Sequence, residues 1–138
     1  MTMQRASLSR KPVFIMQKLL WVDCTAGALV GVAVLALAGW LSRLHGLPHE
    51  VLLFTGVVNL LYASYSFSLA VRAQRPMSLI KLLVFANLAW VPVCLGLAVY
   101  FREQATPFGF AHLVGEALFV GGLAVLEWKQ RYQLLEAA

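Results

Sequence analysis

The chain has 138 residues and a formal net charge of +5, with 61% hydrophobic and 12% charged residues. Soluble domains carry about 25% charged residues, so this composition excludes an ordinary soluble domain and is typical of an integral membrane protein. The positive charge does not indicate a nucleic-acid partner, because the basic residues stand as short flanks beside apolar runs without interleaved aromatic residues. We therefore expect the lipid bilayer, and no nucleic acid, as a partner.

Four apolar runs are each long enough to cross a bilayer as a helix, which needs about 20 apolar residues. They cover residues 19–41, 51–71, 82–101 and 108–126. We expect an all-α, four-helix transmembrane bundle, with residues 1–138 forming a single membrane domain. Asp23 and Glu116 are the acidic residues inside these runs. Asp23 lies near one end of its run, where Lys18 or Lys81 could neutralise it, and we expect it to be structural.

Lysine and arginine are distributed unevenly over the ends of the runs. One side of the predicted bundle carries most of them: Arg5, Arg10, Lys11, Lys18, Arg72, Arg75, Lys81, Lys129 and Arg131. The connections on the other side hold only Arg43 and Arg102. Because basic flanks stay in the cytoplasm, we predict a multi-pass protein of a cell membrane, the bacterial inner membrane, with both termini cytoplasmic.

A weak internal similarity relates the two halves of the chain. An offset of 63 residues places Lys18 on Lys81 and His49 on His112. Such matches are consistent with a 2+2 repeat of helical hairpins, and transporters often place their sites where repeats meet. Apolar composition alone also produces matches of this kind, so both interpretations stay open.

Polar residues recur at helical spacing in the second run and lie level with the acidic residue of the fourth. Asn59 and Glu116 each stand eight residues from the outer start of their run (51 and 108), which is about 12 Å of helix. His112 lies one turn from Glu116, and Tyr62 lies one turn from Asn59. We expect Glu116, His112, Asn59 and Tyr62 to form a ligand-binding or proton-binding site.

The chemistry of this site follows from its depth. An ionised carboxylate there costs several kcal/mol unless it is paired, hydrated or protonated. Burial favours the neutral form of Glu116, whereas a protonated His112 favours the carboxylate, so the two groups could exchange protons. The alternative is a structural role, in which Glu116 hydrogen-bonds Asn59 or Tyr62 between helices.

The third run adds Asn87 and Trp90 to the candidate ligand-binding residues. Pro92 removes one helical hydrogen bond and predicts a kink near them. A kink could line a cavity in which the indole face of Trp90 receives an organic cation. A kinked helix without any ligand is the alternative.

Metal or haem binding is a further hypothesis, but the sequence does not identify a cofactor. His112 and Glu116 are spaced as half of a metal site, and His45 and His49 lie in the outer connection. Haem b needs an axial histidine, usually two, and His112 is the embedded one, with His49 as its nearest candidate partner. No complete ligand motif accompanies these histidines.

Glycines predict close helix packing. Gly27 and Gly31 form a GxxxG pair that suits packing either inside the bundle or between copies of the chain. Gly115, Gly121 and Gly122 are expected to let the fourth run pack tightly around Glu116.

No nucleophile and base stand at helical spacing, so we expect no enzymatic activity. The leading interpretation is transport of a small solute or proton through Glu116. The alternatives are a non-catalytic membrane subunit or scaffold, and a membrane-embedded binder of a ligand, metal or haem. Four spans enclose little room for a pathway, so we expect a homo-oligomer or a membrane partner protein.

Overall fold

The computed structural model describes residues 2–135, and the side chains of residues 18–135. This part of the chain is all-helical. In chain order the helices are α1 (Thr2–Ala36), α2 (Ala38–His45), α3 (His49–Ala70), α4 (Met77–Tyr100), α5 (Pro107–Lys129) and the short 3-10 helix η1 (Gln133–Leu135). The predicted all-α class is confirmed. The basic side chains expected at Arg5, Arg10 and Lys11 lie outside the described side chains.

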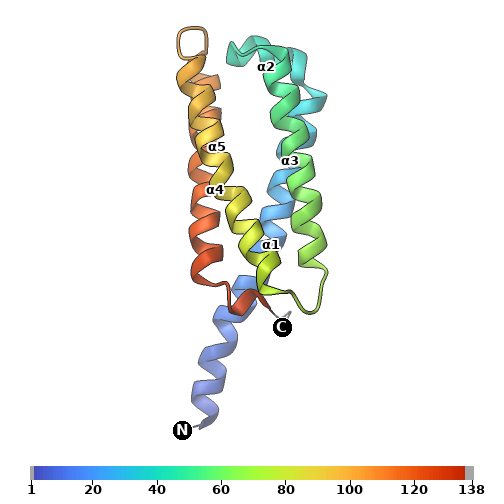
Figure 1. Cartoon of the computed structure of the whole chain (residues 1–138), viewed down its shortest axis with the longest axis vertical. Helices are drawn as coiled ribbons and strands as arrows, with labels where there is room; N and C mark the ends of the chain where they lie inside the picture. Colours follow the sequence, from blue (N-terminus) through green and yellow to red (C-terminus); the bar gives the residue numbers. More distant parts are fainter. Residues whose placement is uncertain (1, 136–138) are drawn as a thin grey trace.

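Four helices are long and apolar enough to cross a membrane, as the sequence predicted. The candidate spans are Lys18–Ala36, His49–Ala70, Met77–Tyr100 and Pro107–Lys129. In Figure 1, α1 lies beside α3 and α4 beside α5, so the four form two helical hairpins. The weak 63-residue repeat remains a prediction, because two hairpins alone do not establish a duplication.

The first helix differs from the predicted run at residues 19–41. It ends at Ala36, and α2 begins at Ala38 after a break at Leu37, whose backbone is not helical. Gly46 ends α2 with a φ of 67°, the left-handed conformation that glycine adopts without strain. The last residues of the predicted first span therefore belong to a separate helix, α2, and do not continue α1. The end of the molecule where α2 lies is called the outer end below, and the opposite end is called the inner end.

Glycines of α1 bring it close to α3. A Cβ atom added at Gly31 would lie 3.0 Å from the carbonyl oxygen of Gly56, and one added at Gly27 would lie 3.3 Å from Ala63 Cβ. Each is tighter than most real Cβ contacts. The GxxxG pair therefore serves packing within the chain, between α1 and α3, which the sequence alone did not decide.

Two apolar clusters occupy the ends of the helices. The outer cluster contains the buried residues Val34, Ala38, Leu47, Leu52, Ala98 and Leu113. The inner cluster contains Leu20, Leu69, Ala70, Ile80, Leu83 and Leu134. Each cluster draws residues from both hairpins, so the hairpins are joined by apolar contacts at both ends. The layer between the clusters holds most of the buried polar side chains.

Arg75 ties the inner end together. Its guanidinium donates hydrogen bonds to the carbonyl oxygens of Leu69 (2.6 Å), Ala70 (3.1 Å) and Leu134 (3.0 Å). The last carbonyls of a helix lack intrahelical partners, so these bonds satisfy the end of α3 and fasten η1 to it. Burial lowers the pKa of Arg75 from its usual value. Arg75, expected as a topological flank, is thus a buried structural residue.

Candidate functional site

Glu116 of α5 receives hydrogen bonds from both hairpins. Its Oε1 accepts one from Asn59 Nδ2 of α3 at 2.9 Å and one from Trp90 Nε1 of α4 at 2.8 Å. His112 Nε2, one turn away on α5, lies 3.3 Å from Oε2. The Glu116 side chain is 10% exposed. Three nitrogen groups therefore surround one nearly buried carboxyl group.

This arrangement agrees in part with the predicted constellation. The structure brings Glu116, His112 and Asn59 together as expected, and Trp90 joins them through its indole N–H. Tyr62, the fourth predicted member, does not bond to Glu116 in the described structure. Its hydroxyl bonds instead to side chains of α1 and α4 that lie away from Glu116.

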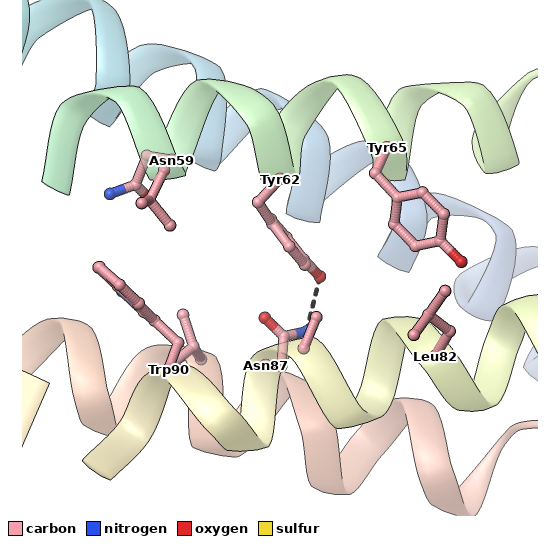
Figure 2. Close-up of a pocket in the computed structure, with 9 residues that line it drawn as sticks. Asn59, Tyr62, Tyr65, Leu82, Asn87 and Trp90 are labelled. Carbon is pink, nitrogen blue, oxygen red and sulfur yellow. Dashed lines mark hydrogen bonds between the residues drawn. The ribbon is translucent and has the colours of Figure 1, made fainter. Parts of the chain in front are cut away.

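Tyr62 belongs instead to a second polar network. Its hydroxyl donates to Asp23 Oδ2 of α1 at 2.5 Å. Asn87 Nδ2 of α4 donates to the Tyr62 hydroxyl at 2.7 Å, as Figure 2 shows, and to Glu127 Oε2 of α5 at 3.1 Å. All four long helices therefore contribute one side chain to this network. Asp23, expected to be paired with a lysine, is 2% exposed and lies within it.

Glu127 was missed by the sequence reasoning. The predicted fourth run stopped at residue 126, whereas α5 continues to Lys129 and the Glu127 side chain is fully buried. The interpretation that Asp23 and Glu116 are the acidic residues of the spans is therefore wrong. A signal was present in the sequence, because Glu127 stands 11 residues after Glu116, about three helical turns, and so shares its face.

Two cavities flank the polar residues between the hairpins. The first has a volume of about 330 Å³ and includes Tyr65, Asn87 and Trp90 in its lining (Figure 2). It matches the cavity expected beside Asn87 and Trp90. The second has a volume of about 240 Å³ and lies against Asp23 and Glu116.

The two cavities are neighbours and share part of their walls. Asn59, Tyr62 and Val120 line both of them. Neither lining contains a lysine or arginine, whereas the second contains two acidic side chains and His112. The cavities therefore suit an uncharged or positively charged occupant better than an anion.

A second histidine continues the line of titratable groups toward the outer end. The ring of His45 in α2 lies 5.0 Å from that of His112, centroid to centroid, and His45 is 6% exposed. Burial, and then repulsion from His112, lowers the pKa of His45 from its usual value of 6.5. Its backbone carbonyl accepts the N–H of Thr106 at 2.9 Å, which joins α2 to the start of α5.

The metal and haem hypotheses gain no support from these positions. Among the described residues, no group of three or more histidine, cysteine, aspartate or glutamate side chains is placed to hold a metal ion. His49 is exposed at the start of α3, and the ring nearest to His112 is that of His45, tilted by 55° from it.

The glycines of α5 do not all behave as expected. A Cβ atom added at Gly115 or Gly122 would meet open space, so these residues do not pack α5 tightly around Glu116. Gly115 instead lines the cavity beside Glu116. Close packing on α5 occurs at Gly109, where a side chain would collide with the His45 carbonyl.

Two buried carboxyl groups, Asp23 and Glu127, and the nearly buried Glu116 thus lie between two helical hairpins, beside cavities whose linings contain no lysine or arginine. A buried carboxyl group is stabilised by hydrogen-bond donors, by a nearby positive charge or by a bound proton. Comparisons with protein families, with curated proteins and with solved structures found no match for this chain.

Proposed function

We propose that this chain is a four-span membrane protein that moves a proton or a small cation through Glu116, with both termini in the cytoplasm. The membrane part is supported by the apolar surface. In each candidate span only 28% of the most apolar window is buried inside the chain. Large apolar side chains such as Leu29, Leu61, Phe85 and Leu118 are more than half exposed. Soluble monomers rarely expose so much contiguous apolar surface, whereas lipid covers it readily.

The orientation is supported by the basic residues of the described part. Arg72, Lys81, Lys129 and Arg131 gather at the end of the molecule where the α3–α4 connection and both termini lie (Figure 1). The opposite end carries Arg43 and Arg102. This asymmetry follows the positive-inside rule with the termini in the cytoplasm.

The position of Glu116 is the observation that supports transport most directly. Its carboxyl group accepts hydrogen bonds from both hairpins and lines a cavity between the outer and inner apolar clusters. Apolar contacts therefore separate this site from both ends of the bundle. Rocking of one hairpin against the other would break the Asn59 bond and open the site to one side.

The lining of the cavities indicates the class of substrate. Glu116 and Asp23 supply negative charge, and aromatic side chains of Tyr62, Tyr65 and Trp90 supply faces that attract cations. We therefore expect a proton, or a proton exchanged for a small ammonium compound, to be moved.

The test is proton flux into vesicles that contain the purified protein and a pH-sensitive dye, driven by a membrane potential. Flux is measured with and without tetraethylammonium or ethylammonium on the opposite side. We expect Glu116→Gln to reduce flux at least tenfold, because the amide cannot carry the proton. Glu103→Gln is the matched control, since Glu103 is exposed in the outer connection, and it should leave flux unchanged.

Two results would count against transport. Wild-type protein without flux under all these conditions would favour the scaffold hypothesis, which predicts co-purification with a membrane partner. Equal flux in wild type and Glu116→Gln would show that any pathway avoids this carboxyl group.

A further inference from the structure

The inner network contains two acids that meet in the interior. The carboxyl groups of Asp23 on α1 and Glu127 on α5 are close neighbours, because Asn87 donates both to Glu127 Oε2 and to the Tyr62 hydroxyl, which in turn donates to Asp23 Oδ2. Both side chains are buried, with exposed fractions of 2% and 0%. Two carboxylates at such a distance repel each other strongly where water is excluded.

The surrounding groups supply too few donors for two charged carboxylates. Tyr62 donates to Asp23, and Asn87 donates to one oxygen of Glu127. The other oxygen, Glu127 Oε1, is buried and has no hydrogen-bond partner among the described groups. An ionised carboxylate has about four acceptor positions, so the donors around this pair are too few for two ionised carboxylates.

Four of the basic groups at this end of the molecule are engaged elsewhere or line another groove. The Arg75 guanidinium is bound to backbone carbonyls, and Arg131 lies over the rings of Trp128 and Tyr132. Lys81 and Lys129 line a separate groove between α4 and α5. Lys18 stands on α1, five residues before the aspartate, and its contribution is tested below.

We propose that Asp23 and Glu127 form a second proton-binding site, in which the two carboxyl groups hold one proton between them. A proton on either acid converts the facing pair into donor and acceptor, which removes the repulsion and provides the missing hydrogen. A metal ion fits less well, because hard cations take six or more oxygen ligands and here Tyr62 and Asn87 present an O–H and N–H groups.

The location of the pair indicates a role in proton transport, and this role rests on the function proposed above. Asp23 lines the same cavity as Glu116, and Tyr62, its hydrogen-bond donor, lines both cavities. The pair lies closer to the inner end than Glu116 does. It is therefore the inner acceptor for a proton that leaves Glu116 toward the cytoplasm.

The proton itself can be observed by infrared spectroscopy of the protein in vesicles at pH 7. A protonated carboxyl group gives a C=O band that an ionised one does not. Asp23 is the one aspartate in the sequence, so ¹³C-labelled aspartate shifts the band of Asp23 alone, without any substitution. Labelled glutamate in the Glu116→Gln variant reports Glu127 without a contribution from Glu116.

We expect a protonated-acid band, about one proton per chain, that moves with the aspartate label, the glutamate label or both. It should be lost in the double variant Asp23→Asn, Glu127→Gln, because no carboxyl group then remains at this site to carry the proton. Glu103→Gln should retain it.

The inference is overturned if neither label moves such a band in wild-type protein. It is also overturned if the band is absent from wild type and present in Lys18→Met, since the lysine would then balance the pair. Replacing sodium with choline at constant pH must leave the band unchanged; a band that grows when sodium is removed would show that a metal ion occupies the pair. A protonated-acid band without proton flux would support the proton-binding pair and contradict the transport function. Proton flux without such a band would support transport and contradict the proton-binding pair.

Discussion

The outer and inner halves of the molecule differ in how many hydrogen-bond donors surround their carboxyl groups. In the outer half, Glu116 has no second acid beside it: its Oε1 accepts hydrogen bonds from Asn59 and Trp90, and His112 Nε2 lies 3.3 Å from its Oε2. In the inner half, Asp23 and Glu127 are close neighbours and share two donor side chains. The donor-rich site satisfies a negative charge, whereas the donor-poor site calls for a proton. Two sites of unequal charge along one face of α5 are what stepwise proton transfer requires.

The two ends also close differently. The outer end is closed by α2, whose His45 carbonyl accepts the backbone N–H of Thr106 and packs directly on Gly109. The inner end is closed by the guanidinium of Arg75, which holds the end of α3 and η1. The outer closure consists of neutral backbone contacts, while the inner closure depends on one charged side chain. The inner end is therefore the more vulnerable to a single substitution.

The largest effect is expected from removing that side chain. Arg75→Met removes the side-chain donor from the carbonyls of Ala70 and Leu134 and one of the two donors of the Leu69 carbonyl, which also accepts the backbone N–H of Arg72. Hydrogen bonds from a charged donor contribute about 1.5 to 3 kcal/mol each and are not additive, so we expect a loss of about 3 kcal/mol in the free energy of unfolding. The measurement is unfolding in mixed detergent micelles, followed by circular dichroism.

Arg72→Met is the matched control, because Arg72 carries the same charge in the same connection but is exposed. It should change the free energy of unfolding by less than about 0.5 kcal/mol. Equal losses in the two variants would mean that the net charge of the connection, and not the buried guanidinium, stabilises the inner end.

The next two substitutions compare the hydrogen bonds around Glu116 with those of the Asp23–Glu127 network. Asn87→Leu removes the amide that donates to both Tyr62 and Glu127. Asn59→Leu removes one donor of Glu116, which keeps Trp90 and His112. We expect losses of about 2 kcal/mol for Asn87→Leu and about 1 kcal/mol for Asn59→Leu, measured by the same unfolding experiment.

The order of these two losses is the critical result. Leucine is similar in size to asparagine, so both variants keep the packing and change mainly the hydrogen bonding. A larger loss for Asn59→Leu would indicate that the outer network is the less well satisfied of the two, contrary to the comparison above.

A smaller effect is expected when only one donor N–H is removed and its ring is kept. Trp90→Phe loses the indole bond to Glu116 but retains an aromatic wall for the cavity. We expect a loss of about 1 kcal/mol in the free energy of unfolding. Trp128→Phe is the control, since Trp128 is 45% exposed and should change little. Equal values for both variants would mean that the indole N–H contributes nothing measurable.

The sequence predicted the helices well because long apolar runs leave few alternatives in a bilayer. It also brought Glu116, His112 and Asn59 together, since equal depth and helical spacing fix which residues can meet. Equal depth and helical spacing depend only on position along a helix, and the contacts of Glu116 with Asn59 and His112 agree with both.

The inner network was predicted poorly for physical reasons that can be named. Glu127 lies at the end of the apolar run, where a charged residue ordinarily marks the boundary, and only the continuation of α5 to Lys129 buries it. Tyr62 was placed by its backbone level, but its hydroxyl bonds to side chains of α1 and α4 that lie away from Glu116. The break at Leu37 lets α2 leave the direction of α1 and contact the start of α5, and local hydropathy does not report such a contact.

The smallest expected effect is a pH dependence that arises at the outer closure. Burial and the neighbouring His112 lower the pKa of His45 in the folded protein below 6.5, its usual value. Between these two values the unfolded chain binds more protons than the folded one, so the stability contributed by neutral His45 is complete above about pH 6.5 and is lost as the pH falls below it. His45→Gln should flatten this part of the stability profile, measured by thermal unfolding in detergent from pH 7.5 to 5, while His49→Gln, at an exposed position, should not. An identical profile in wild type and His45→Gln would place the acid sensitivity elsewhere in the molecule.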